Sequence, residues 1–311
     1  MPAAKTRLGI RGSQFTINGD PVFLYGISYY AGLGAPEKFI RQDLADIKKY
    51  GFNWIRIWAN WPGSDSNISA IDHQGNARAI LMNKLEWIIK RCDRKGIIVD
   101  VTLSHGDGIK DQKTYRHAVA TLVTALKPYQ NWYIDLANER DIRDKRFVSF
   151  EELEQLCRMV KDRYPRLLVT ASAGNDISRE DLNRYLRIAR VDFICPHRPR
   201  NAASAAQTAS KTREYLAMMK ALGRVVPVNY QEPFRRGYTR WQPGVTDYVT
   251  DLQGALAAGA AGWCFHNGDQ GGDPDGMPHR SFDLHRRRLF DQLDPVEMQA
   301  IRKISRQIKT R

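Results

Sequence analysis

Short apolar runs alternate along the chain with longer segments whose apolar residues recur every three or four positions. The short runs, rich in β-branched and aromatic residues, predict buried strands, and the longer segments predict amphipathic helices. Eight runs of the first kind follow one another at 22–25, 53–58, 97–103, 131–139, 167–171, 191–195, 224–232 and 261–265. Helical patterns separate them near 37–50, 77–95, up to 126, 150–164, from 178, 203–222 and 245–258, with a final helix after 294.

Two of the expected helices carry clear start signals. Ser178 and Asp181 have the spacing of a capping box, with Asp where Glu or Gln is usual. Asp294, Pro295 and Glu297 place a cap, a first-turn proline and a capping-box acid in register. These signals support helices that begin directly after each of them.

Strands that alternate with helices indicate parallel βαβ units, and eight uninterrupted units indicate a closed α/β barrel, the (β/α)8 or TIM barrel. No Gly-x-Gly-x-x-Gly follows the first strand, which disfavours a dinucleotide-binding fold. A chain of 311 residues suits one such barrel, which needs about 250 residues. We therefore expect a single domain over 1–311, with a short β-hairpin at about 8–23, turning at Asn18-Gly19, and the barrel at about 22–311.

The composition, 42% hydrophobic and 26% charged residues, is that of a soluble globular protein with a sizeable core. No apolar run approaches the roughly 20 residues of a membrane-spanning helix, so no membrane partner is expected. The first residues lack a signal-peptide pattern, which predicts a cytoplasmic protein, or a secreted one if an export signal has been removed. Four cysteines without short spacings predict reduced core thiols and no zinc site.

The net charge of +14 raises the question of nucleic acid. Lys and Arg are spread over most of the chain, however, and no RNP, zinc-finger or P-loop pattern accompanies them. We interpret the charge as a solvated basic surface and do not expect a nucleic-acid partner. The Asp/Gly-rich stretch 269–276 lacks the spacing of a calcium loop, so neither a metal nor a cofactor is expected.

Two glutamates, Glu139 and Glu232, each close an apolar strand-like run. Burying a carboxylate without partners is costly, so such a position usually delivers the side chain to a polar cleft. In a barrel of this kind, active sites are built from the carboxyl ends of the strands. Two carboxylates at one rim make the pair that cleaves glycosidic bonds.

Other polar residues fall at the same strand ends, and together they resemble the clan A retaining glycoside hydrolases, the cellulase/mannanase-like (β/α)8 barrels. The resemblance covers nearly the whole chain. It rests on the 15–23 hairpin opening, Arg56, His105, Asn138-Glu139, His197, Glu232 and Trp263. An Asn-Glu pair after the fourth strand, with Glu after the seventh, is its specific signal.

The resemblance implies that Glu139 is the acid/base and Glu232 the nucleophile. It implies that Asn138 holds the sugar 2-hydroxyl and that Arg56 keeps the nucleophile ionised. By the same resemblance, His105 and His197 orient hydroxyls or carboxylates, and Trp263 offers a flat face to a sugar ring.

Alternatives stay open for several of these residues. Arg56 also suits a structural ion pair with Asp100 or Asp135, and Trp263 suits core packing. Trp58 and Trp61 could equally wall the cleft or pack in the core. Pro199 stands where many clan members carry a tyrosine that donates to the nucleophile, and Tyr230 or Arg198 is the candidate replacement.

The predicted function is that of a retaining β-glycoside hydrolase acting on a β-linked oligosaccharide or glycoside. The arginines 198, 200, 235 and 236 near the expected mouth are compatible with an acidic sugar. A transglycosylase would use the same residues. A non-catalytic barrel that binds glycans or polyanions is the alternative from another class, and steep salt dependence would distinguish polyanion binding.

Overall fold

Parallel strands form the centre of the molecule and pair around a ring. The computed structural model describes residues 5–61, 67–106, 108–109, 111–267 and 282–309. Seven strands make one sheet in the order β11-β12-β4-β5-β6-β7-β8. Their bounds are Leu24–Ser28 (β4), Trp54–Trp58 (β5), Ile98–Thr102 (β6), Trp132–Asp135 (β7), Leu168–Thr170 (β8), Asn229–Tyr230 (β11) and Gly262–Phe265 (β12).

A short second sheet completes the ring. Strand β9 (Ser172–Ala173) follows β8 after one residue and pairs in parallel with β10 (Cys195–Pro196). A parallel bridge between Ile194 and Val228 then joins the β10 segment to the residues ahead of β11. The eight runs predicted from the sequence therefore lie side by side in chain order, as a (β/α)8 barrel requires.

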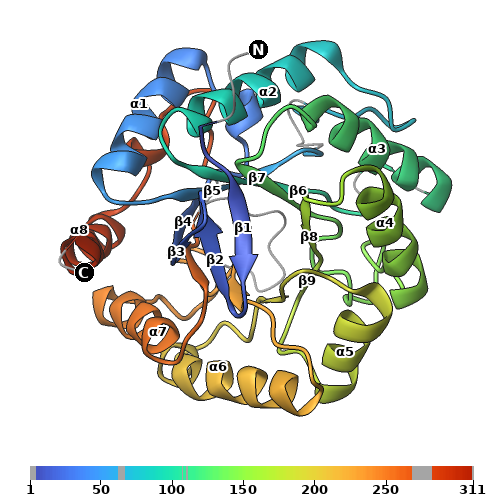
Figure 1. Ribbon diagram of the computed structural model, residues 1–311. Coiled ribbons are helices and arrows are strands. Elements are labelled where there is room, and N and C mark those ends of the chain that lie inside the picture. The colour runs from blue at the N-terminus through green and yellow to red at the C-terminus, as the bar shows by residue number, and fades with distance from the viewer. Residues whose placement is uncertain (1–4, 62–66, 107, 110, 268–281, 310–311) are drawn as a thin grey trace.

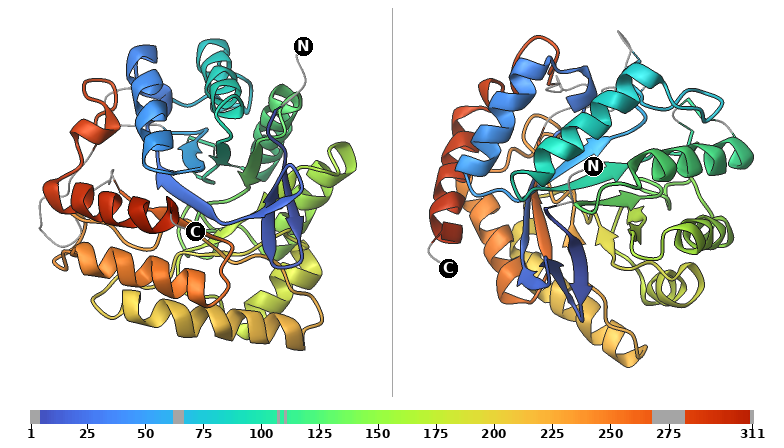
Figure 2. Two further views of the ribbon diagram at one scale, coloured as in Figure 1. Left: turned by 60° about the vertical axis from the view of Figure 1, so that its left-hand side comes forward. Right: turned by 45° about the horizontal axis from the view of Figure 1, so that its top comes forward.

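Helices surround this ring on the outside (Figure 1). They are α1 (Glu37–Lys49), α2 (Ala79–Asp93), α3 (Gln112–Leu126), α4 (Phe150–Arg163), α5 (Arg179–Arg184), α6 (Ser204–Ala221), α7 (Val245–Ala257) and α8 (Pro295–Lys309). A π-helical turn, Tyr185–Ala189, extends α5, and 3₁₀ turns lie at Gly32–Gly34 and Leu289–Asp291. Helices α6, α7 and α8 lie side by side (Figure 2).

The N-terminal helix caps predicted from the sequence are present in the structure. Ser178 accepts a hydrogen bond from the backbone N–H of Asp181 at the start of α5. Asp294 and Glu297 exchange backbone-to-side-chain hydrogen bonds of 2.9 Å at the start of α8, which is a complete capping box. All four cysteines are buried and free. Among the described residues, no helix combines the length and apolarity needed to cross a membrane.

Strand alternation divides the side chains between two environments. On β5, Ile55 and Ile57 pack in the large core that lies between the strands and the helices, whereas Trp54 belongs to a second apolar cluster inside the barrel. Because successive strand residues point to opposite faces, Arg56 follows Trp54 into the barrel interior. The same phase places Asp100 of β6 and Asp135 of β7 inside, and all three charged residues are fully buried.

An antiparallel sheet precedes the barrel and packs across one end of it (Figure 1). It has three strands, β1 (Leu8–Arg11), β2 (Gln14–Ile17) and β3 (Asp20–Val22), one more than a simple hairpin. Asn18 and Gly19 join β2 to β3 with φ of 56° and 95°, the left-handed geometry that an Asn-Gly turn provides. Leu8 and Phe15 from this sheet share the apolar cluster inside the barrel with Trp54, so the sheet closes its floor.

Candidate active site

Glu139 lies in the loop four residues beyond the end of β7, in an unusual backbone conformation. Its φ is +49°, a region that non-glycine residues seldom adopt and that costs on the order of 1–3 kcal/mol. Its backbone N–H donates to Ser172 Oγ at 3.0 Å, which ties this turn to β9. A Cβ at Gly174 would lie 2.6 Å from Ile142 Cδ1 and 3.5 Å from Glu139 Cβ, so a larger residue there would displace the Ile142 side chain that packs beneath this turn. The backbone conformation and the hydrogen bond to Ser172 together fix the orientation of the Glu139 side chain.

Glu232 lies two residues beyond β11, and its carboxylate is nearly buried. One of its oxygens lies within 4.8 Å of an oxygen of Glu139, and His197 Nδ1 lies within the same distance of both. His197 Nδ1 is 3.2 Å from Glu139 Oε1 and 3.7 Å from Glu232 Oε2. The two glutamates expected from the sequence therefore form a carboxylate pair, with His197 between them.

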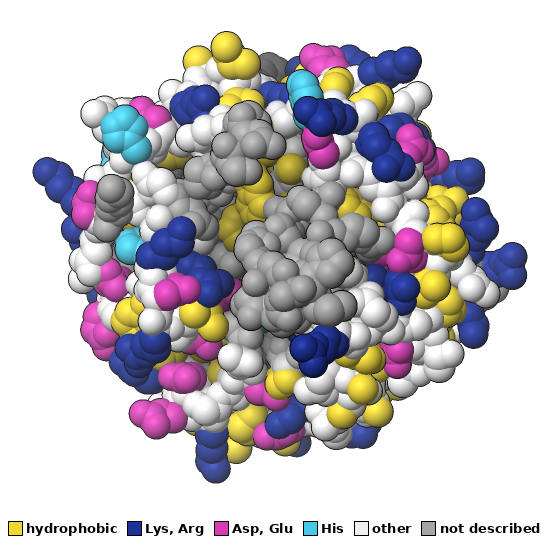
Figure 3. Space-filling view, turned by 180° about the vertical axis from the view of Figure 1, so that it is seen from behind, with side chains coloured by type: hydrophobic (Ala, Val, Ile, Leu, Met, Phe, Trp, Pro, Cys, Tyr) yellow, Lys and Arg dark blue, Asp and Glu magenta, His cyan; other side chains and the backbone are white. Residues whose placement is uncertain are grey.

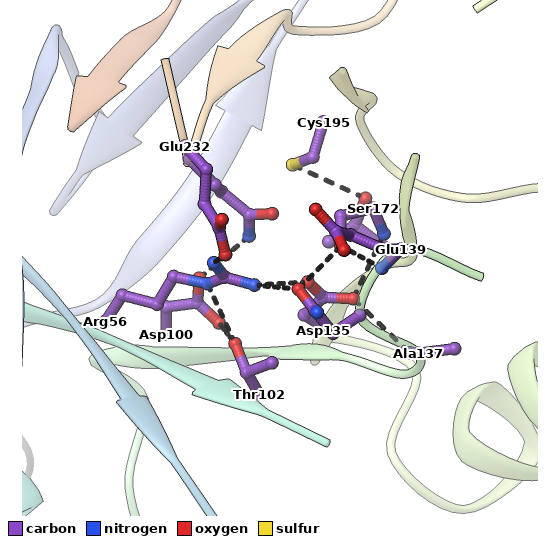
Figure 4. A network of polar contacts seen from close by, with 12 residues as sticks. Arg56, Asp100, Thr102, Asp135, Ala137, Glu139, Ser172, Cys195 and Glu232 are labelled. Carbon is purple, nitrogen blue, oxygen red and sulfur yellow. Dashed lines mark hydrogen bonds and ion pairs between the residues drawn. The ribbon is translucent and has the colours of Figure 1, made fainter. Parts of the chain in front are cut away.

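Arg56 is the centre of a buried ionic network beneath this pair (Figure 4). Its Nη1 donates to Glu232 Oε1, and its Nη2 lies 3.2 Å from Asp135 Oδ2. Its Nε lies 3.2 Å from Asp100 Oδ2. Arg56 therefore pairs both with the buried aspartates and with Glu232, the candidate nucleophile.

The layer of side chains under the site is polar as well. Asp100 Oδ2 accepts hydrogen bonds from Gln231 Nε2 at 2.7 Å and from Tyr133 Oη at 3.0 Å. Burial, together with the charge of Asp135, raises the pKa of Asp100 to about 7, although Arg56 opposes the shift. Near neutral pH, Asp100 can therefore carry a proton. Arg56 separates Asp100 from Glu232, because its guanidinium contacts both carboxyl groups.

A second arginine, Arg200, lies against both carboxylates. Its Nη2 is 2.8 Å from Glu232 Oε2 and 3.1 Å from Glu139 Oε1. A third, Arg146, donates from Nη1 to the other oxygen of Glu139. Arg200 lies beside Glu232, where the sequence predicts a hydrogen-bond donor from Tyr230 or Arg198. Arg198 instead contacts Asp176 and Thr208, and Arg236 pairs with Asp294.

These cations control the charge of the pair. Burial disfavours ionisation of Glu139, but the hydrogen bond from His197 and the charge of Arg200 outweigh it and lower its pKa to about 2. Burial likewise opposes ionisation of Glu232, but the neighbouring His197, with Arg56 and Arg200, holds its pKa well below the usual range. In the ligand-free protein both carboxylates are therefore ionised and balanced by guanidinium groups.

His266 and Tyr30 form the wall of the site beside Glu232. His266 Nε2 accepts from Arg235 Nη1 at 3.1 Å and lies 3.4 Å from Glu232 Oε2. Burial holds the pKa of His266 well below its usual value, so its ring is neutral. Because an arginine can only donate, the ring proton is on Nδ1, which is 2.8 Å from Tyr30 Oη.

Several predicted site residues meet the carboxylate pair and others do not. Arg56, Asn138 and His197 are in contact with it or with one another. His105 instead contacts the backbone oxygen of Lys145 at 2.9 Å and the ring of Tyr115. Trp58 is buried, with the Arg56 guanidinium 5.6 Å from its ring centre and Trp61 packed edge-on against it.

The structure does not support a sugar platform at Trp263 or a donor at Tyr230. Trp263 is fully buried in the core outside the barrel, and its indole N–H donates to Asp251 of α7 at 2.6 Å. Tyr230 is buried against α6, with its hydroxyl 2.7 Å from Thr212 Oγ1. Strand alternation explains both results, because Cys264 and Gln231 occupy the inward positions next to them.

Tyr30 and Arg146 have no role predicted from the sequence, and the sequence pattern around His266, at the start of the loop after the eighth strand, fits a sugar contact and a plain turn equally well. Alternation could have indicated His266, which is two residues beyond the inward-facing Cys264. The same alternation could have indicated Tyr30, which is two residues beyond Ser28 of β4, whereas Arg146 lies in a loop without a periodic signal. The charge of Arg146 becomes informative only once its distance to Glu139 is known.

One group of side chains within the described ranges has the donor atoms of a metal site: Glu139, His197 and Glu232. Arg56 and Arg200 already occupy oxygens of both carboxylates, however, and their charges would repel a cation. The expected absence of a calcium loop at 269–276 concerns residues outside the described ranges.

Comparison with known proteins places the fold. No protein-family model matches the chain, and no curated protein matches its sequence. Solved structures do match over nearly the whole chain. The endo-1,4-beta-mannanase from Rhizomucor miehei has a TM-score of 0.67 and 15% identity, covering 98% of this chain and 100% of that one.

Two further structures agree. A glycoside hydrolase family 5 mannosidase from Rhizomucor miehei has a TM-score of 0.65 and 13% identity, with 99% of this chain and 98% of that chain covered. The beta-mannanase from Thermomonospora fusca has a TM-score of 0.63 and 14% identity, with 95% and 94% covered. The molecule thus has the barrel fold of these mannan- and mannoside-acting proteins.

Proposed function

We propose that the protein is a retaining β-glycoside hydrolase that acts by double displacement on a β-linked oligosaccharide or glycoside. The separation of Glu139 and Glu232 carries the proposal. Retaining enzymes hold their two carboxyl groups about 5–5.5 Å apart, whereas inverting enzymes leave about 6.5–9.5 Å for a water molecule. Carboxylate oxygens within 4.8 Å of each other support the retaining arrangement.

In the first step, Glu232 acts as the nucleophile. Its carboxylate attacks the anomeric carbon, and the bond to the leaving-group oxygen breaks as Glu139, which takes up a proton from solvent when substrate binds, donates that proton to this oxygen. The products of this step are a glycosyl ester on Glu232 and the released alcohol. Arg56 supports the reaction by keeping Glu232 ionised in the free protein.

In the second step, Glu139 acts as a base. It takes a proton from water, the hydroxide oxygen bonds to the anomeric carbon, and the ester bond to Glu232 breaks. The sugar leaves with its original configuration, and both glutamates return to their starting states. Esterification neutralises Glu232, which removes the charge that would hold a proton on Glu139 and so favours its action as a base.

Asn138 is the proposed ligand of the sugar 2-hydroxyl. Its Oδ1 accepts from Arg56 Nη2 at 2.8 Å, so its amide NH2 group is the end that can donate to substrate. Hydrogen bonds to the 2-hydroxyl strengthen in the transition state of this reaction. The mannanase and mannosidase names of the structural neighbours support a β-linked saccharide as the substrate class.

Two other functions use parts of the same geometry. A transglycosylase would share the first step and replace water with a sugar hydroxyl in the second. A non-catalytic polyanion binder would need a continuous patch of positive charge on its surface. On the face shown in Figure 3, Lys and Arg side chains are interspersed with Asp and Glu, which favours the enzyme.

Turnover of aryl β-glycosides by the wild type, Glu139→Ala and Glu232→Ala tests the proposal. The panel consists of the glucoside, mannoside, galactoside, xyloside and glucuronide. Activity should fall by at least about 10³-fold in Glu232→Ala. Azide should rescue both variants, giving the β-glycosyl azide with Glu139→Ala and the α-glycosyl azide with Glu232→Ala.

Glu154→Ala is the matched control, because Glu154 lies partly exposed on α4, pairs with Arg158 and is not among the site residues. It should retain wild-type turnover. Activity that survives both site substitutions would refute the assignment. Salt-sensitive glycan binding without any turnover would favour the non-catalytic alternative.

A further inference from the structure

Arg200 occupies the position that a substrate must enter. Its guanidinium touches Glu139 and Glu232 at the same time, through one nitrogen, at 3.1 and 2.8 Å. During double displacement the anomeric carbon and the glycosidic oxygen lie between these two carboxylates. A bound sugar therefore cannot coexist with this position of Arg200.

Moving Arg200 away from the pair has an energetic consequence. Its side chain is only 17% exposed, so the charge is largely withdrawn from water. A buried guanidinium that loses both of its carboxylate partners is strongly destabilised unless another anion replaces them. A neutral sugar supplies no such anion, whereas a sugar that carries a carboxylate does.

A second guanidinium, that of Arg235, shares the ring of Tyr238 with Arg200. Arg235 has its charged group 4.0 Å from the centre of the Tyr238 ring, and Arg200 lies 5.9 Å from the same ring. Arg235 Nη1 donates to the neutral His266, and in the described part of the chain no carboxylate pairs with Arg235. The Nε atoms of both arginines are buried and have no hydrogen-bond partner there.

We propose that Arg200 and Arg235, converging on Tyr238, form a receptor for the carboxylate of a uronic acid, and that Arg200 transfers to it from Glu139 and Glu232 when substrate binds. The preferred substrate is then a β-linked saccharide with a hexuronic acid in the cleavage subsite. This inference rests on the proposed glycoside hydrolase function and names its substrate class.

The transfer would also prepare the catalytic acid. Arg200 is one of the groups that hold the pKa of Glu139 low. When its charge moves to the substrate carboxylate, the pKa of Glu139 rises, and Glu139 can take up the proton that it must donate. A neutral sugar has no carboxylate with which Arg200 can pair, so we expect a neutral sugar to be bound and cleaved poorly.

The test compares matched substrates in one assay. Aryl β-glucuronide, β-galacturonide and β-mannuronide are measured against the corresponding hexosides, the uronide methyl esters and the hexoside 6-sulfates. The best uronide should exceed its hexoside in kcat/KM by at least about tenfold, and its methyl ester should behave like the hexoside. A preference for the 6-sulfate would overturn the carboxylate assignment.

Variants connect the preference to the two arginines. Arg235→Gln and Arg200→Gln should each lower the ratio of kcat/KM for the uronide to kcat/KM for the hexoside by at least about tenfold. Arg200→Lys should retain part of the uronide preference, because the charge remains. Arg158→Gln, on exposed α4, is the matched control and should change neither substrate.

A binding measurement separates this inference from the proposed activity. Titration calorimetry of the wild type with methyl β-D-glucuronide, its galacto- and manno-epimers and the matching neutral methyl glycosides needs no turnover. At least one uronide should bind about tenfold more tightly than its neutral counterpart, and Arg235→Gln should remove the difference. Equal or absent binding refutes the receptor. Arg235-dependent uronide binding with no Glu232-dependent turnover refutes the hydrolase while the receptor stands.

Discussion

Arg56 donates a 2.8 Å hydrogen bond from Nη2 to Asn138 Oδ1, and the same guanidinium donates from Nη1 to Glu232. One buried cation thus fixes both the orientation of the amide proposed to bind the 2-hydroxyl and the charge of the proposed nucleophile. Asp100 and Asp135 hold this guanidinium from the opposite side. The structural and functional roles of Arg56 cannot be separated, because the same planar group makes all of these contacts.

Arg56→Gln should destabilise the fold by about 3–5 kcal/mol, since it leaves buried carboxylates without their cation. Urea unfolding at pH 7 measures this loss. The destabilisation should be smaller at pH 4.5, where Asp100, with its pKa near 7, is already protonated. Arg41→Gln, which removes an exposed arginine of α1, is the control. An unchanged unfolding midpoint in Arg56→Gln would contradict the network described here.

His197→Phe should move the alkaline limb of the kcat/KM profile to higher pH. The His197 hydrogen bond to Glu139 helps to hold the pKa of that carboxyl low, so its removal raises this pKa. Glu139 is then protonated up to a higher pH, and the alkaline limb should shift by at least about one unit. His117→Phe, at an exposed position on α3, should leave the limb in place. Identical profiles for His197→Phe and the wild type would count against Glu139 as the acid.

Trp61 and Trp263 should respond differently to substitution. Trp61 is partly exposed and stacks on Tyr30, whose hydroxyl reaches His266 at the site. Trp61→Ala should therefore raise KM by about tenfold, as the loss of an aromatic sugar contact would. Trp263→Phe should leave KM unchanged but cost about 1–3 kcal/mol of stability, because Asp251 loses a buried donor. A rise in KM in Trp263→Phe would restore it as a sugar platform.

Asp251→Asn should reduce the pH dependence of stability. Burial raises the pKa of Asp251 to about 6 against the hydrogen bonds from Thr208 and Trp263, above its ordinary value of 3.8. The folded state therefore keeps a proton that the unfolded chain releases, and this contribution, complete below about pH 4, is lost as the pH rises through 6. Between pH 4.5 and 7 the wild type should lose about 1–3 kcal/mol more than Asp251→Asn.

Unfolding free energies at the two pH values measure this difference. Asp162→Asn, at an exposed position of α4, should follow the wild type. Equal losses in the wild type and in Asp251→Asn would show that Asp251 is ionised in the folded protein throughout this range.

Periodicity made the elements and the carboxylate pair predictable. The apolar runs located the strands, although β10 and β11 have only two residues each, and both glutamates lie in loops just beyond their strands. Parallel strands direct their carboxyl ends to one rim, so residues that follow them must gather there. Glu139 and Glu232 could be paired on this argument across 93 positions of sequence, and Asp135 could be matched to Arg56 by strand phase.

The sequence by itself thus determined the barrel, the rim that bears the site and the two carboxylates, because these follow from repeated local patterns and from the rule that parallel strands align. The tertiary structure alone decided which cations meet the pair and which aromatic rings face it. Arg200 and Arg146 come from loops without a periodic pattern, and their distances to Glu139 depend on how neighbouring loops pack. Trp263 points outward because the phase of a strand is set by its register with its neighbours, which sequence composition does not specify.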